Sequence, residues 1–377
     1  MKIKQQHWSD KEGWVFEPSE NNCKDAQLVF VFGSPTHIKN KSRFDEIREF
    51  YPQAQILGAS TAGEICGPRA HENSLSVTAV FLEHTTLASR QMTITSEKSF
   101  SVGEELILSL PQEGLRHIFV LSDGLNTNGS ELIKGMSKHL PKGVSVTGGL
   151  AADNGKFIET GVALNDLPGN NNIVAIGFYG SRFKIGYGSK SGFIPFGPER
   201  VVTRSDRNVL YELDNEPAFE LYRKYLGDKI KDFPTTCFHF PIWLIDKEVE
   251  DGTVRTILGF DEKIGSITFA GDIPEGTHAK LMKANTDNLV SGAEEAAKNC
   301  VLQGSEKPEF AILISCVGRK IVMSQRVEEE IEIVRDVFSP DTTLAGFYSY
   351  GEIAPFGNSN LHRLHNQTMS ITTFSEL

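Results

Sequence analysis

An internal repeat constrains the fold of this chain more than any other feature of its sequence. Each copy begins with a short apolar run, continues through an amphipathic helix and a second apolar run, and ends in a glycine-containing turn. The first copy spans residues 28–81 and contains Gly63-Glu64-Ile65. The second spans residues 310–374 and contains Gly351-Glu352-Ile353 at the corresponding point. The recurrence of this tripeptide after a helix and a strand indicates a duplicated unit.

A third, weaker copy lies between residues 117 and 153. Its helix is expected to begin at a Ser130 cap, as the first copy's helix is at Ser42, and Asp153 takes roughly the place of the glutamate. A strand, helix and strand in succession normally make a right-handed crossover between parallel strands, and the alternating strands that follow indicate antiparallel neighbours. The sequence therefore predicts an α/β fold of mixed sheets built from repeated β-α-β-β units.

The length of the chain predicts about two domains. It has 377 residues, and a domain commonly takes roughly 150. A breaker cluster, Gly197-Pro198, precedes a new polar stretch and favours a boundary near residues 198–208. We therefore expect two associated subdomains, residues 25–205 and residues 206–377.

The charge balance argues against several kinds of partner. The chain carries 38 Lys and Arg against 49 Asp and Glu, a net charge of −11, and no short window is dominated by basic residues. Neither nucleic acid nor a membrane surface is an expected partner. Residues 1–11 are polar, without the apolar region of a secretory signal, and the apolar runs are only strand-sized. Five scattered cysteines without C-x-x-C spacing favour a reducing cytoplasm over a disulfide framework or zinc site.

The repeated Gly-Glu turn has two interpretations. Small residues between a strand and the next element let backbone N–H groups approach a ligand, and Glu64 could hold an ammonium or a hydroxyl. Alternatively the glycines serve the turn and the glutamate caps it. Recurrence at Glu352 leaves both interpretations open, because a duplicated fold repeats structural turns as well. If Gly63 or Gly351 has a positive φ, alanine at that position should be destabilising.

An enzymatic alternative centres on Ser60 or on a pair of carboxylates. An esterase-like nucleophile elbow needs G-x-S-x-G, and the sequence around Ser60 lacks the second glycine. The two glutamates could form an acid and base pair, although nothing in the sequence brings them together. No dinucleotide or P-loop glycine motif occurs. A hydrolase is therefore the alternative of another class, and we expect Ser60 to lie out of reach of any histidine.

The histidines do not show a metal-binding pattern. His362 and His365 are three positions apart, but their segment runs into a strand and no third ligand lies nearby. A b-type haem needs only one axial histidine and an apolar pocket, and so leaves little linear trace. Covalent haem attachment through C-x-x-C-H is excluded because that motif is absent.

In order and spacing, several blocks together resemble the FIST domain, a bacterial sensory module of signal transduction. They cover about residues 25–375, divided into an N-terminal FIST part (25–205) and a C-terminal FIST part (206–377). The blocks are residues 57–65, 121–125, 146–153, 194–198, 210–218, 315–319, 346–353 and 365–368. The resemblance implies a non-enzymatic sensor that binds a small ligand and signals through a separate protein.

The chain also resembles the stand-alone nitric oxide-sensing protein (NosP) branch of this family, which binds haem and regulates a partner histidine kinase. That resemblance implies haem b as cofactor, nitric oxide as signal and a cytoplasmic location, with His365 as the candidate iron ligand. The alternative is a sensor of an amino acid or similar small polar ligand without haem. The candidate ligand-binding residues are Ser60, Gly63, Glu64, Asp153, Cys316, Arg319, Gly351, Glu352, His365, Asn366 and Gln367.

Overall fold

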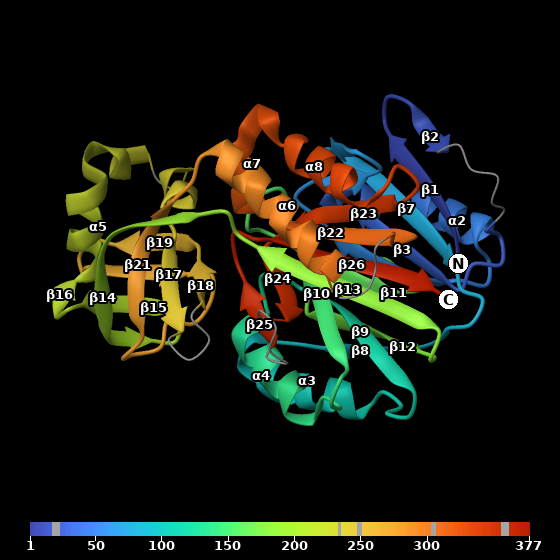
Figure 1. Ribbon diagram of the computed structural model, residues 1–377, viewed down its shortest axis with the longest axis horizontal. Coiled ribbons are helices and arrows are strands. Elements are labelled where there is room, and N and C mark those ends of the chain that lie inside the picture. Colours follow the sequence, from blue (N-terminus) through green and yellow to red (C-terminus); the bar gives the residue numbers. More distant parts are fainter. Residues whose placement is uncertain (17–22, 233–234, 247–250, 303–306, 356–361) are drawn as a thin grey trace.

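The computed structural model describes the chain apart from residues 17–22, 233–234, 247–250, 303–306 and 356–361. Figure 1 shows a larger part, made of three sheets with helices, and a smaller part built around a fourth sheet. Strands and helices are mixed throughout, and the sheets contain both parallel and antiparallel pairs. The predicted α/β class with mixed sheets is confirmed.

Three β-α-β-β units form the larger part. In each unit the first two strands are parallel, with a helix between them, and the last strand lies antiparallel on the other side of the first. The first unit is β3 (Leu28–Gly33), α2 (Lys41–Phe50), β4 (Gln55–Ser60) and β7 (Ser74–Phe81). The second is β9 (Leu115–Ser122), α4 (Gly129–His139), β10 (Ser145–Leu150) and β12 (Asn172–Tyr179). The third is β22 (Phe310–Cys316), α8 (Glu329–Phe338), β23 (Thr343–Ser349) and β26 (Met369–Glu376).

A fourth strand extends each unit on the side of its last strand. The antiparallel partners of β7, β12 and β26 are β1 (Lys2–Ser9), β8 (Thr86–Thr93) and β13 (Phe183–Lys190). Outer strands β2 (Gly13–Phe16), β6 (Arg69–His71) and β25 (His362–His365) lie at sheet edges.

The three units exchange strands in a closed ring. The strand that follows the second strand of one unit does not stay in its own sheet but pairs with the second strand of another unit. Thus β5 (Glu64–Cys66), from the first unit, pairs with β23 of the third. In turn β24 (Gly351–Pro355), from the third unit, pairs with β10 of the second, and β11 (Val162–Leu164), from the second, pairs with β4 of the first. No unit completes a six-stranded sheet alone.

The sheets face one another across a common apolar core and carry helices on their outer faces. Aromatic rings from all three units meet inside, with the ring centroids of Phe30 and Phe119 5.4 Å apart and those of Phe30 and Phe310 5.8 Å apart. The outer helices include α3 (Ser99–Leu108), which packs on α4, and α6 (Thr286–Leu302), which packs on α8. Because both faces of the central strands are covered, these strands are apolar runs without alternation.

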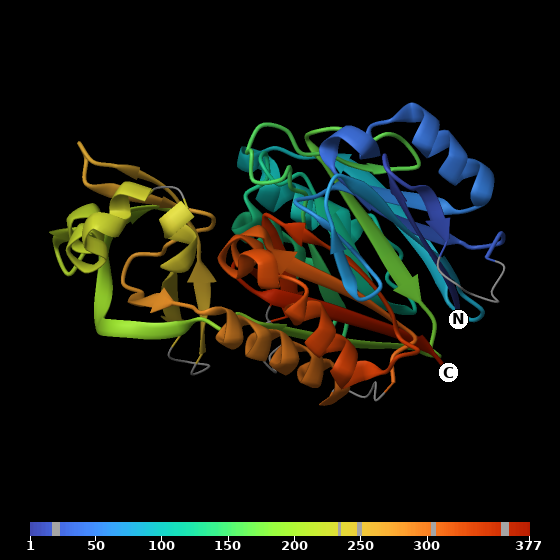
Figure 2. The ribbon, with the colours of Figure 1, turned by 90° about the horizontal axis from the view of Figure 1, so that it is seen from above.

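The smaller part is inserted into the third unit, between β13 and α6, and has its own apolar core. Figure 2 shows α6 leaving this part and running along the larger one. The elements of the insertion are β14 (Ile194–Asp206), β15 (Val209–Leu213), β16 (Glu216–Pro217), α5 (Ala218–Leu226), β17 (Ile242–Asp246), β18 (Asp251–Arg255), β19 (Ile257–Asp261), β20 (Ser266–Phe269) and β21 (His278–Lys283). The remaining short helices are α1 (Pro35–Ile38), α7 (Val317–Met323) and four 3-10 turns, η1 (Ser96–Lys98), η2 (Gly227–Asp232), η3 (Thr235–His239) and η4 (Ser324–Arg326).

The expected boundary at residues 205 and 206 falls at the end of β14, which pairs with β15 inside the inserted sheet. The segment after residue 286 returns to the larger part, where β22, β23, β24 and β26 pair among themselves and with strands of the first two units. The two predicted subdomains are therefore associated through shared sheets and not only through surface contact.

Both expected helix caps lie two residues too late. The side chain of Asn40 accepts hydrogen bonds from the backbone N–H groups of Ser42 and Arg43 and so caps α2. In the same way Asn128 caps α4, two residues before Ser130. Asparagine caps as well as serine does, and here its carbonyl oxygen reaches the free N–H groups of the first turn.

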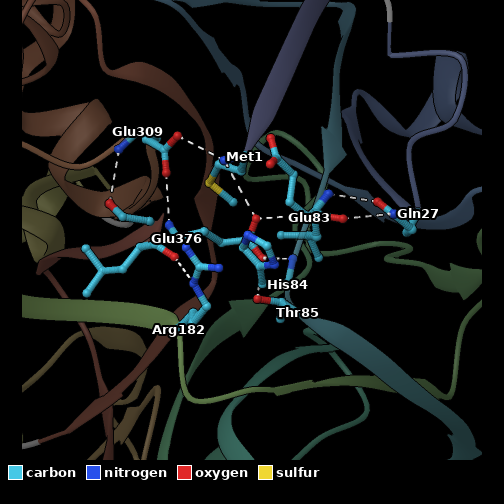
Figure 3. Close-up of polar contacts among 11 residues, drawn as sticks. Met1, Gln27, Glu83, His84, Thr85, Arg182, Glu309 and Glu376 are labelled. Atoms are coloured by element: carbon cyan, nitrogen blue, oxygen red, sulfur yellow. Dashed lines mark hydrogen bonds and ion pairs between the residues drawn. The ribbon is translucent and has the colours of Figure 1, made fainter.

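The last strand is joined to the first unit by a buried carboxylate (Figure 3). Glu376 accepts hydrogen bonds from the backbone N–H groups of Glu83 and His84 and from the hydroxyl of Thr85. Burial alone would raise the pKa of Glu376, but these three donors lower it. Glu309, just before β22 of the same unit, accepts the backbone N–H of Glu376 and the N-terminal amine of Met1.

We predict that Gly148→Ala destabilises the protein. Gly148 lies in the middle of β10 with φ 152°, and an added Cβ would overlap the carbonyl group of Val120 on the parallel strand β9. The expected loss in free energy of unfolding is about 1–3 kcal/mol, measured by urea denaturation. Gly259→Ala, in β19, is the control because nothing lies within 4 Å of its added Cβ. Equal effects of the two substitutions would contradict the assigned strain.

Candidate functional site

Glu64 and Glu352, the glutamates of the repeated motif, fasten two of the exchanged strands. Both side chains are fully buried. Each carboxylate accepts two hydroxyl hydrogen bonds, one from the end of the second strand of its own unit and one from the beginning of the last strand, to within one residue. The donors are Thr61 (2.6 Å) and Ser74 (2.5 Å) for Glu64, and Ser349 (2.6 Å) and Thr368 (2.8 Å) for Glu352. This geometry supports the structural interpretation of the motif.

The glycines of the motif differ in conformation. Gly63 has φ 133°, and a Cβ there would lie 2.9 Å from Nζ of Lys320. Gly351 has no positive φ, and its lack of a side chain is explained by Leu364, whose Cδ1 would lie 2.9 Å from an added Cβ. Only the first of the two turns therefore requires left-handed backbone.

The second unit departs from the expected equivalence. Val162 of β11 pairs with Ala59 at the register position that the glutamates occupy on their exchanged strands. Asp153 lies before a longer loop and caps it, accepting backbone hydrogen bonds from Phe157 (2.9 Å), Ile158 (2.7 Å) and Glu159 (2.9 Å) as well as one from the hydroxyl of Tyr350. The inserted loop moves the exchanged strand away from Asp153, so this residue does not take the place of the glutamate.

Ser60 is not assembled into a hydrolytic site. Its side chain is fully buried, and its hydroxyl accepts a hydrogen bond from the backbone N–H of Gly161 at 2.9 Å. In the described part of the chain it contacts no histidine, as expected. The geometry offers no activated nucleophile at this position.

Arg319 and Glu330 form an ion pair with no solvent exposure on either side chain. Nη2 of Arg319 lies 2.8 Å from Oε2 of Glu330, and the other carboxylate oxygen, Oε1, accepts a hydrogen bond from the hydroxyl of Ser315. The same guanidinium donates to the carbonyl oxygens of Ser191, just before the inserted sheet, and Leu289, in the helix that follows it. One arginine thus holds both connections between the two parts.

The candidates Cys316, Asn366 and Gln367 are buried as well. Burial raises the pKa of the Cys316 thiol, and the Glu352 carboxyl raises it further, so the thiol is protonated and unreactive. Asn366 and Gln367 are fully buried. Gln367 donates from Nε2 to the carbonyl oxygen of Phe238 in the inserted part, whereas neither side-chain atom of Asn366 has a hydrogen-bond partner among the described residues.

A separate cleft of about 720 Å³ lies between the two parts of the molecule. Its volume is within the usual range for pockets that bind small molecules. One wall comes from the inserted sheet, through β17, β18, the turn before β21 and β21 itself. The other comes from the start of α4 and from β25, which face the inserted sheet in Figure 1. The lining side chains that bear charge are Lys134, Asp246, Arg255, Asp272, Glu275 and Arg363.

Polar contacts across the cleft hold its walls in place. Arg363 of β25 pairs with Asp246 of β17 and donates to the hydroxyl of Thr253 at 3.3 Å. Lys134 of α4 lies 3.6 Å from a carboxylate oxygen of Asp272. Charges of both signs line the cleft beside apolar side chains such as Ile133 and Leu244, so a small ligand that carries polar groups would find partners there.

None of the residues proposed from the sequence lines this cleft. The cleft residues come from three distant segments, around residues 130–134, 244–278 and 362–364. His362 was noted only for its spacing from His365; in the structure its Nε2 accepts a hydrogen bond from the backbone N–H of Val146, beneath the cleft. The only local signal is the polar turn 272–278, and nothing in the linear sequence connects it to the other two segments.

The surroundings of His365 do not fit a haem in this arrangement. His365 borders a second cavity of about 240 Å³, which is smaller than usual ligand pockets of about 300–1,000 Å³. The walls of that cavity mix polar residues such as Lys190 and Asn299 with apolar ones such as Phe193. Nε2 of His365 lies 3.3 Å from the carbonyl oxygen of Ala354 and not toward an open coordination position.

The described residues contain neither a metal-binding cluster nor a membrane-spanning helix. No group of three or more His, Cys, Asp or Glu side chains there is arranged to hold a metal ion. No described helix combines the length and apolar character needed to cross a membrane.

The repeated α/β scaffold and its ligand-sized cleft define a protein with a candidate small-molecule binding site. The chain belongs to the FIST family: the FIST N domain model matches residues 27–216 and the FIST C domain model matches residues 218–355. FIST domains are sensory domains associated with small-ligand binding in signal transduction. The chain is also similar to the uncharacterised protein MJ1623 of Methanocaldococcus jannaschii, with 23% identity over 393 residues that cover 93% of this chain and 73% of the relative.

We predict that the stability of the protein falls as pH rises through neutrality. Burial raises the pKa of Glu64 from 4.5 to about 7 and that of Glu352 to about 8, although their hydroxyl donors act in the opposite direction. Between about pH 4.5 and 8 the folded state therefore binds more protons than the unfolded state, and stability that is complete below this range is lost as pH rises.

The Glu352→Gln variant tests this pH dependence. The glutamine cannot ionise, so the slope of unfolding free energy against pH should become shallower by up to about 1.4 kcal/mol per pH unit, measured by urea denaturation across the range. Glu105→Gln, at an exposed position, is the control and should leave the slope unchanged. A slope unaltered in Glu352→Gln would show that the buried carboxyl is already ionised at acidic pH.

We also predict that breaking the buried ion pair is costly. Arg319→Met leaves the Glu330 carboxylate buried without its partner, and we expect a loss of about 3–5 kcal/mol in free energy of unfolding. The double variant Arg319→Met with Glu330→Leu should lose clearly less than the sum of the two single variants, because neither charge remains. Additive losses would mean that the two residues do not stabilise one another.

Proposed function

We propose that this protein senses a small polar ligand that binds in the cleft between its two parts, and that it passes the signal to a separate protein. The cleft itself carries the proposal, since it has ligand-sized volume and is lined by charges of both signs. The general role of FIST domains, which is small-ligand sensing, supports the proposal. More specifically, we propose that the separate protein is a histidine kinase, because the chain resembles stand-alone FIST sensors.

The position of the cleft is consistent with a sensor. A ligand there contacts the inserted sheet on one side and α4 and β25 on the other, so its binding energy acts on the relative placement of the two parts. The contacts between Arg363 and Asp246, and between Lys134 and Asp272, are polar and close to solvent. Contacts of this kind are weak enough for a ligand to rearrange.

The test is a thermal-shift screen of the full chain against amino acids and other small polar metabolites. A ligand at about 100 times its dissociation constant should stabilise the folded state by about 2.7 kcal/mol. Lys134→Trp places a large side chain at the cleft from a surface position and should abolish the shift. Lys138→Trp, on the same helix but outside the cleft lining, should leave the shift intact. Binding that survives Lys134→Trp would place the ligand elsewhere.

Haem with nitric oxide as signal stays a prediction, with His365 as the candidate iron ligand. One observation favours it: burial lowers the pKa of His365 to about 4, with Arg255 acting in the same direction, so the imidazole is neutral as metal ligation requires. Purification after expression with haem supplied is the test. A Soret band that shifts on addition of nitric oxide and is lost in His365→Ala would support haem, and no band in the wild type would eliminate it.

A further inference from the structure

Arg255 differs from the other basic residues of the cleft, Lys134 and Arg363, because it forms no ion pair with a described residue. It is 93% buried, with a relative exposure of 7%. Its Nε donates to the backbone carbonyl oxygen of Asp272 (3.2 Å), and its Nη1 donates to those of Val254 (3.4 Å) and Leu364 (2.9 Å). Within the described part of the chain, Nη2 has no hydrogen-bond partner and the guanidinium forms no ion pair.

The other basic residues of the cleft already have acidic partners, and its remaining carboxylate has a backbone donor. Arg363 forms its ion pair with Asp246, and Lys134 lies 2.6 Å from Glu131 and 3.6 Å from Asp272. Glu275 accepts the backbone N–H of Ser205. The positive charge of Arg255 is therefore the one in the cleft that a partner from outside the chain would neutralise.

A glycine makes room for the guanidinium itself. Gly271 packs against it so closely that an added Cβ would lie 2.8 Å from Nε and 3.0 Å from Cζ. Burial lowers the pKa of Arg255 to about 10, and nearby Arg363 lowers it as well while Asp272 raises it, so the side chain remains charged at neutral pH. A buried cation without a counter-ion is unfavourable, and an incoming anion relieves that cost.

We infer that the cleft ligand carries an anionic oxygen group, a carboxylate or a phosphate, that binds against Nη2 of Arg255. This inference rests on the proposed function and specifies its ligand class. Hydrogen bonds from a guanidinium to such oxygens are charge-assisted and shorter than neutral ones, and burial strengthens them further. The remaining polar groups of the ligand would then face the mixed charges of the opposite wall.

The test measures binding of simple probes by calorimetry and thermal shift on the full chain. The probes are succinate, inorganic phosphate and the neutral isostere succinamide, each compared with sodium chloride at equal ionic strength. We expect at least one of succinate and phosphate to bind and succinamide not to bind, and the two anions distinguish a carboxylate site from a phosphate site.

Two variants connect this binding to Arg255. Arg255→Lys keeps the charge but loses the planar donor group, and Gly271→Ala displaces the guanidinium without removing it; each should weaken anion binding roughly tenfold or more. Arg90→Lys is the matched control, because Arg90 is a surface arginine that also donates to backbone carbonyls. A cleft variant counts as folded if its circular dichroism spectrum and its urea midpoint are close to those of the wild type. One folded variant is enough to interpret the result, so the test stands even if the other variant does not fold.

The outcomes separate the inference from the proposed function. Anion binding that is unaffected in both folded variants, or no anion binding to the wild type, would overturn the inference. If succinamide or another neutral ligand binds in a manner sensitive to Lys134→Trp but not to Arg255→Lys, the cleft is still a ligand site and only the assigned anion is wrong. If binding of every ligand survives Lys134→Trp, the proposed function itself fails.

Discussion

The exchange of strands around the ring is the constraint on which the rest of this structure depends. Each of the three sheets ends with a strand that another unit supplies, so the hydrogen bonds of one sheet form only when a second unit is in place. Two of these strands carry a buried glutamate that accepts hydroxyl hydrogen bonds from its own unit. The carboxylates therefore link a strand in one sheet to the unit from which it departs, and they explain a repeated motif without a ligand.

The same exchange builds one wall of the cleft. The strand β24 crosses from the third unit into the sheet of the second, and β25 follows it as the next strand of that sheet. Arg363 and Leu364 are thereby brought beside α4, which belongs to the second unit. The inserted sheet supplies the facing wall, with Arg255 donating to the carbonyl oxygen of Leu364. Residues from three segments meet only because a strand leaves its own unit.

Local sequence signals were sufficient to predict the β-α-β-β units but not the way in which the units assemble. The apolar runs and helical spacing of residues 28–81 and 310–374 predict a strand, helix and strand because those periodicities depend on near neighbours. Pairing of Glu64 opposite Phe347 depends on contacts between residues far apart in the chain, and no periodicity encodes it. The site was missed for the same reason: Lys134, Arg255 and Arg363 are unremarkable singly, whereas the conspicuous Gly-Glu turns proved to be buried supports.

Arg319 has a mechanical consequence beyond its contribution to stability. It binds the carbonyl oxygens of Ser191 and Leu289, one on each connection to the inserted sheet, and its own position is set by Glu330 on α8. Both connections to the inserted sheet are therefore tied to one guanidinium, which lies on α7 and is paired with α8, while Leu289 belongs to α6. The three helices and the two connections thus share a single charged anchor, at a place separate from the cleft.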